Sequence, residues 1–79
     1  MQRRKMREEN LRHNGGQLRD DEGGEPLVLP QKHRKGVTPP PNEAHVDHVV
    51  PKAAGGSNDY TNLRVISRER NLKKGAKVP

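Results

Sequence analysis

Three residues in the second half of the chain suit hydrolysis of a phosphodiester bond. This reaction needs a base that activates water, a Lewis acid at the phosphate and cations along the backbone. His48 is a candidate for the base, because an imidazole titrates near neutral pH. The side chains of Asp47 and Asn71 offer the oxygen ligands that Mg²⁺ and Mn²⁺ prefer. The sequence therefore predicts a site with one divalent metal, of which Mg²⁺ is the preferred ion and Mn²⁺ the alternative.

Basic residues surround this set and are candidates for binding the phosphates of a substrate. They are Lys52, Arg64, Arg68, Arg70, Lys73, Lys74 and Lys77. His45 lies two residues before Asp47 and is a candidate for a hydrogen bond to a metal ligand or for a contact with the substrate. An ordinary strand position is the preferred interpretation of His45.

Asp47 and His48 fall near the end of a strand expected over residues 43–50, which Pro51 terminates. Adjacent strand residues point to opposite faces of a sheet. Distortion before the proline would let the carboxylate meet a metal while the imidazole addresses a water molecule beyond it.

The elements expected after this strand are a loop over 52–61 that turns at Gly55-Gly56, a strand over 63–66 and a helix over 68–74. Ser67 is a typical N-cap for this helix, and Gly75 suits its end. The helix would return Asn71 to the first strand. The lone aromatic residue, Tyr60, is expected to pack on a thin core.

The first half of the chain is expected to support this unit. Residues 2–13 have good helix propensity, and the arginines at 3, 4, 7 and 12 either contact phosphates or form a solvated basic face. Leu27–Leu29 suit a short strand. Residues 31–42 form a basic, proline-rich loop in which His33 is expected to be exposed. We predict a single domain over 1–79, with the helix and loop in 1–42 and the catalytic core in 43–79.

Composition limits how this domain can be stabilised. Leu, Val, Ile and Phe make up 14 of the 79 residues, and the formal net charge is +6. A chain of this size rarely gains more than about 3–5 kcal/mol from its core, so we expect a metal, a nucleic acid or a partner chain to add stability. There is no cysteine and therefore no disulfide. The basic N-terminus lacks the apolar region of a signal peptide, and no apolar run is long enough to cross a membrane.

The pattern Asp47-His48-Val49-Val50-Pro51, a Gly-Gly loop, Asn62-Leu63 and Asn71 before Lys-Lys-Gly resembles the HNH endonucleases. The resemblance implies an α+β fold with a small ββα-metal (His-Me finger) core, here joined by a basic N-terminal helix and irregular loops. It also implies that His48 is the general base, that Asn62 braces the loop and orients His48, and that Asp47 and Asn71 bind the metal. DNA is the expected substrate, with little sequence preference.

Two departures from the family pattern affect what can be carried over. The family's third motif position, often His, is Asn71, so the chain is an H-N-N variant, which favours Mg²⁺. Asn14-Gly15-Gly16-Gln17-Leu18 resembles the family's N-G-G-x-C stretch, with Leu18 where a zinc-binding cysteine often stands. The zinc ribbon that supports many relatives is therefore not expected here.

The segment 38–75 is similar to nuclease toxin domains at the C-termini of Rhs-type and other polymorphic toxins. This similarity implies a C-terminal fragment of a larger secreted effector, delivered into the cytoplasm of a target cell and blocked by an acidic immunity protein. Phage and restriction nucleases are alternative contexts. Two other classes remain open: a non-catalytic basic module that binds nucleic acid, and a zinc module built on His13, His33, His45 and His48, whose spacings match no common zinc pattern.

Overall fold

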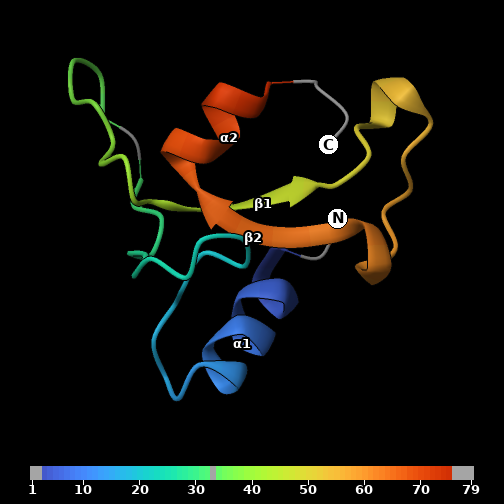
Figure 1. Ribbon diagram of the computed structural model, residues 1–79. Helices are drawn as coiled ribbons and strands as arrows, with labels where there is room; N and C mark the ends of the chain where they lie inside the picture. Colours follow the sequence, from blue (N-terminus) through green and yellow to red (C-terminus); the bar gives the residue numbers. More distant parts are fainter. Residues whose placement is uncertain (1–2, 33, 76–79) are drawn as a thin grey trace.

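A computed structural model describes residues 3–32 and 34–75 of the chain (Figure 1). His33 and Lys77 lie outside the described residues. The described elements are helix α1 (Arg3–His13), strand β1 (Ala44–His48), the 3-10 turns η1 (Lys52–Ala54) and η2 (Tyr60–Asn62), strand β2 (Leu63–Ser67) and helix α2 (Arg68–Lys74). Two helices and one antiparallel sheet confirm the predicted α+β class.

The two strands form an antiparallel hairpin with a long connection. Val46 pairs with Val65 at its centre, and the register runs from Ala44 opposite Ser67 to His48 opposite Leu63. β1 is shorter at both ends than the predicted strand over 43–50.

Asn62 explains where β1 ends. Its side-chain oxygen accepts the Val50 N–H (2.8 Å), while its main-chain oxygen accepts the Val49 N–H (2.8 Å). A side chain therefore replaces the next rung of the ladder, and the chain leaves the sheet immediately after His48.

The helices cover opposite faces of the hairpin, α1 below it and α2 above it in Figure 1. On the α1 side, Leu18, Leu27, Ala44 and Val65 form a buried cluster, against which Met6, Leu11 and Val46 pack. Ile66 is fully buried and, because side chains alternate along a strand, points to the α2 side. The apolar core is small, as the composition predicts.

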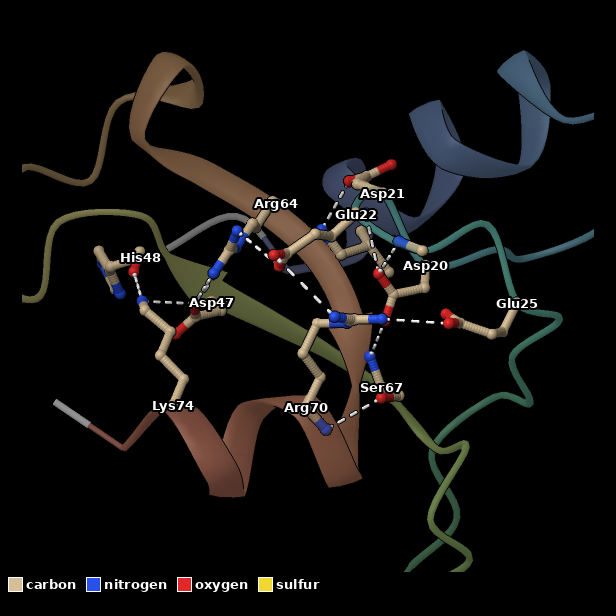
Figure 2. A network of polar contacts seen from close by, with 12 residues as sticks. Asp20, Asp21, Glu22, Glu25, Asp47, His48, Arg64, Ser67, Arg70 and Lys74 are labelled. Carbon is tan, nitrogen blue, oxygen red and sulfur yellow. Dashed lines mark hydrogen bonds and ion pairs between the residues drawn. The ribbon is translucent and has the colours of Figure 1, made fainter. Parts of the chain in front are cut away.

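Asp20 ties the first half of the chain to the corner between β2 and α2 (Figure 2). Its fully buried carboxylate accepts hydrogen bonds from the Ser67 N–H (2.9 Å) and Arg70 Nε (3.0 Å) through Oδ2. Through Oδ1 it accepts the N–H groups of Glu22 (2.8 Å) and Gly23 (3.0 Å). One carboxylate thus satisfies donors from a loop, a strand and a helix.

Asp21 and Asn10 continue this network along the outer edge of β2. The Asp21 N–H donates to the Val65 carbonyl (2.8 Å), and Asp21 Oδ2 accepts the Val65 N–H (2.7 Å). Asn10, which is buried in α1, donates to Asp21 Oδ1 (2.9 Å) and exchanges hydrogen bonds with the main chain of Arg19. The acidic loop over residues 20–25 therefore occupies the edge of β2 at which a third strand would pair, and it also binds α1.

Helix α2 begins and ends where the sequence predicts. Ser67 Oγ accepts the Arg70 N–H (3.0 Å) as the N-cap, and the Gly75 N–H donates to the Asn71 carbonyl (3.0 Å). The cap fixes the direction in which α2 leaves β2 and hence brings Asn71 over β1.

Two sequence predictions about the fold are wrong. Leu27–Leu29 do not form a strand. Val28 makes a single parallel bridge to Glu43, and the prolines on both sides of the segment have no N–H with which to extend a ladder. Tyr60 is 42% exposed and lies under Lys5 Nζ, 4.9 Å from the ring centre, so it is not part of the buried cluster. No helix in the described part of the chain is long and apolar enough to cross a membrane.

We predict that Asp20→Asn destabilises the fold by about 1–3 kcal/mol at neutral pH, since buried donors lose a charged acceptor. Burial by itself raises the pKa of Asp20, but hydrogen bonds from Gly23, Ser67, Glu22 and Arg70 outweigh it, so the pKa lies below its usual 3.8. The stabilisation is therefore complete above that value and lost as the pH falls through the lowered pKa.

Urea unfolding followed by circular dichroism between pH 7 and pH 2 measures this effect. The difference between the wild type and Asp20→Asn should shrink as the pH falls. Asp59→Asn is the matched control, because Asp59 is exposed and its carboxylate bonds only to Ser57 within the described residues. A difference that stays constant down to pH 2 would show that the charge of Asp20 does not stabilise the fold.

Candidate active site

Two side-chain pairs hold α2 against β1. His45 and Asp47 are alternate residues of β1 and point to the α2 side, while Asn71 and Lys74 lie one turn apart on α2. Asn71 Nδ2 donates to His45 Nδ1 (3.0 Å), and Lys74 Nζ donates to Asp47 Oδ2 (2.7 Å). The two predicted metal ligands, Asp47 and Asn71, therefore lie at the same contact between strand and helix.

His45 connects Asn71 to a buried carboxylate. Because the Asn71 amide donates to His45 Nδ1, the ring hydrogen lies on Nε2, which is 2.9 Å from Glu43 Oε1. Glu43 is only 2% exposed. The Asn71 amide nitrogen is therefore used in the hydrogen bond to His45. Its amide oxygen accepts no hydrogen bond within residues 3–32 and 34–75 and remains available as a ligand atom.

Asp47 is neutralised by two cations (Figure 2). Lys74 Nζ contacts both Asp47 Oδ2 and the His48 carbonyl oxygen, and Arg64 Nε lies 3.5 Å from the same carboxylate oxygen. Arg64 also donates to Glu22 (3.0 Å). The side chains of Lys74 and Asp47 are 10% and 12% exposed, so water screens this cluster poorly.

His48 lies at the last position of β1, and Asn58 orients its ring. His48 Nε2 is 2.8 Å from Asn58 Oδ1, which places the ring hydrogen on Nε2. Nδ1 is then the basic nitrogen, the atom that a general base requires. No pattern in the sequence marks Asn58 as the partner of His48, because the two residues are ten positions apart and only the folded loop brings them together.

Asn62 fastens the loop that carries Asn58. Its amide nitrogen donates to the carbonyls of Val50 (3.0 Å) and Ser57 (2.8 Å), and its oxygen accepts the Val50 N–H. Gly56 packs beneath it, and a Cβ there would lie 1.7 Å from the Val50 carbonyl oxygen. These contacts close the loop over 51–61 directly behind His48.

The predicted phosphate-binding residues fall into two groups. Arg64, Arg70, Lys73 and Lys74 form ion pairs with carboxylates of the protein, as Arg70 does with Asp20 (3.0 Å) and Glu25 (3.1 Å). Lys52 and Arg68 form no ion pair within the described residues. Binding of substrate by either group stays a prediction, but only the second group needs no rearrangement to meet a phosphate.

The donor set fits a hard divalent cation. Among the described residues, no group of three or more His, Cys, Asp or Glu side chains could hold a metal, so nothing in them resembles a tetrahedral zinc site. Mg²⁺ needs only one or two protein oxygens and keeps several water ligands. Asp47 Oδ2 and the His48 carbonyl oxygen bind the Lys74 ammonium group, so these two oxygens already attract a cation.

Comparison with known proteins gives one match. A family model described as HNH endonuclease matches residues 31–77, which is more than half of the chain. No curated protein and no solved structure gives a significant match. The matched region contains Asp47, His48, Asn62 and Asn71.

We predict that Asn62→Ala loosens the loop over 51–61 and lowers the free energy of unfolding by about 1–3 kcal/mol, because it leaves the Val50 N–H and two carbonyls without their partners. Amide hydrogen exchange should show lost protection at Val50 before β1 opens. Asn42→Ala is the control, since the Asn42 side chain makes a single long hydrogen bond of 3.5 Å within the described residues. Unchanged exchange at Val50 would contradict a bracing role for Asn62.

Proposed function

The chain belongs to the HNH endonuclease family, and we propose that it is a divalent-metal-dependent endonuclease that cleaves DNA with little sequence preference. The observation that carries the proposal is the arrangement of His48: Asn58 engages Nε2, and Nδ1 is left as the basic atom next to Asp47 in the chain. A base beside an oxygen ligand is what hydrolysis of a phosphodiester bond requires.

In the proposed reaction, His48 Nδ1 takes a proton from a water molecule that attacks the scissile phosphorus. The bond between phosphorus and the leaving oxygen then breaks, and the leaving oxygen is protonated from solvent. Asp47 and Asn71 would hold a divalent ion, Mg²⁺ or Mn²⁺, that supplies Lewis-acid stabilisation of the charge on the phosphate and the leaving oxygen.

Two further residues act through these groups. Asn62 fixes the loop that carries Asn58 and thereby the orientation of His48. His45 holds the amide nitrogen of Asn71 and so leaves the amide oxygen as the atom that would bind a metal. We assign both residues positioning roles.

The preference for DNA without sequence recognition is supported by charge and by the size of the chain. The formal net charge is +6, and contacts of cations with phosphates carry no sequence information. The sequence contains no element with the pattern of a base-reading module. Lys52 and Arg68, which lie between His48 and Asn71 in the chain, are the proposed contacts with the nucleic-acid backbone.

We extend the proposal to a toxin role, supported by the similarity of segment 38–75 to the nuclease tips of polymorphic toxins. In that role the chain is the C-terminal part of a larger secreted effector and acts in the cytoplasm of the target cell. An acidic immunity protein is its proposed partner, since a basic chain attracts an acidic surface.

Cleavage of supercoiled plasmid by the purified chain tests the catalytic proposal. We expect relaxed or linear product with Mg²⁺ or Mn²⁺ and none with EDTA. His48→Ala should reduce the rate by roughly 10²–10⁴-fold, the usual contribution of a general base. His13→Ala is the control, because His13 is exposed on α1 and lies near Glu9 (3.6 Å).

Two results would contradict the proposal. Plasmid binding without cleavage in any divalent metal would leave a non-catalytic nucleic-acid-binding module. Equal activity of His48→Ala and the wild type would show that another residue is the base.

We also predict that Lys74 competes with the metal for Asp47. Lys74→Met should bind Mn²⁺ in the absence of DNA more tightly, on the order of tenfold, since removing a nearby unit charge changes the binding free energy by about 1.4 kcal/mol. Isothermal titration calorimetry or Mn²⁺ electron paramagnetic resonance measures this without relying on activity. Lys73→Met is the control, because Lys73 is exposed and pairs with Glu69 (3.5 Å). Unchanged or weaker Mn²⁺ binding by Lys74→Met would refute the competition.

A further inference from the structure

A groove of about 390 Å³ runs between α1, β1 and α2. It is lined by Arg3 and Arg7 of α1, by residues 43–46 and by Asn71 of α2, with Pro30 at one side. Because α1 and α2 cover opposite faces of the hairpin (Figure 1), a groove that touches both helices passes around the edge of β1 that faces away from β2.

Arg3 and Arg7 give this groove a positive charge that is not neutralised. They are one turn apart on α1, and neither pairs with a carboxylate in the described ranges 3–32 and 34–75. The single acidic residue in the lining is Glu43, which is 2% exposed and hydrogen-bonded to His45. The groove therefore presents guanidinium groups to solvent and conceals its carboxylate.

The other arginines of α1 behave differently. Arg4 pairs with Glu8 (3.2 Å) and Arg12 pairs with Glu9, and none of these four residues lines the groove. The helix thus separates its arginines into a neutralised pair and a pair that faces the groove. A solvated basic helix would not require this separation.

The groove reaches the candidate site through Asn71 and His45. Asn71 is the proposed metal ligand from α2, and its partner His45 lies beside it in the lining. A strand whose scissile phosphate lies at Asp47 and Asn71 would continue into the groove. Guanidinium groups bind phosphate oxygens in a bidentate manner, which suits Arg3 and Arg7 to that neighbouring backbone.

We propose that this groove binds the sugar–phosphate backbone of the substrate strand next to the scissile phosphate, with Arg3 and Arg7 as phosphate ligands. The proposal rests on the nuclease function proposed above and adds to it a substrate-binding surface supplied by the N-terminal helix. It assigns α1 two tasks: packing on the core through Met6 and Leu11, and holding the substrate through Arg3 and Arg7.

The test compares two double variants of the full chain that remove the same charge from the same helix. Arg3→Gln/Arg7→Gln (the groove variant) removes the two arginines that line the groove. Arg4→Gln/Arg12→Gln (the control variant) removes the two arginines that are paired with glutamates. Glutamine has nearly the helix propensity of arginine, so α1 should remain folded in both, as circular dichroism can verify. Binding to a fluorescein-labelled DNA duplex is measured by anisotropy in EDTA over a range of salt concentrations.

For the groove variant we expect roughly 30-fold weaker binding near 0.15 M salt and a salt slope smaller by about 1.8, the value for two lost phosphate contacts. The control variant should lose less than about threefold, because its arginines are already paired and lie outside the groove.

Equal losses in the two variants would overturn the proposal, because they would show that only net charge matters. The proposal would also be overturned if the groove variant bound polyglutamate more weakly but bound DNA as the wild type does. That result would indicate that the groove binds an acidic protein. The nuclease proposal has a separate test: it fails if the wild-type chain does not cleave DNA. The binding measurement is made in EDTA and does not depend on cleavage.

Discussion

A single buried carboxylate holds the fold in the orientation that the site needs. Asp20 accepts hydrogen bonds from Ser67 and Arg70 at the corner between β2 and α2, and from two amides of its own loop. Six apolar side chains are buried among the residues that the structure describes, so burial alone leaves α2 weakly held. Arg70 precedes Asn71 in the chain, and the residue that anchors α2 therefore determines where the proposed metal ligand lies.

Carboxylates hold the acidic loop that follows Leu18 in the chain. Leu18 is buried in the core, and the loop binds β2, α2 and α1 through Asp20 and Asp21. Because the hydrogen bonds to Asp20 lower the pKa of its carboxyl group, the stability of the fold depends on pH.

Local patterns in the sequence were sufficient to predict the hairpin and α2. Ser67 as N-cap and Gly75 at the helix end act within one turn, so the sequence alone reveals them. The partners of Arg64 and Arg70 were not predictable, because Glu22 and Asp20 lie 42 and 50 residues away and only the fold brings them together. Leu27–Leu29 failed as a predicted strand for the same reason: a strand needs a partner edge, and this segment forms a single bridge, between Val28 and Glu43.

The distribution of charge follows from this architecture. Arg64, Arg70 and Lys74 suit phosphate binding by residue type, yet the fold uses them to neutralise Glu22, Asp20 and Asp47. The cations that remain unpaired among the described residues include Arg3 and Arg7, which are far from the motif in the sequence but line the groove that reaches Asn71. A basic composition thus says little about which residues meet a substrate. That assignment depends on where each carboxylate is buried, because every internal ion pair removes one cation from the surface available to a polyanion.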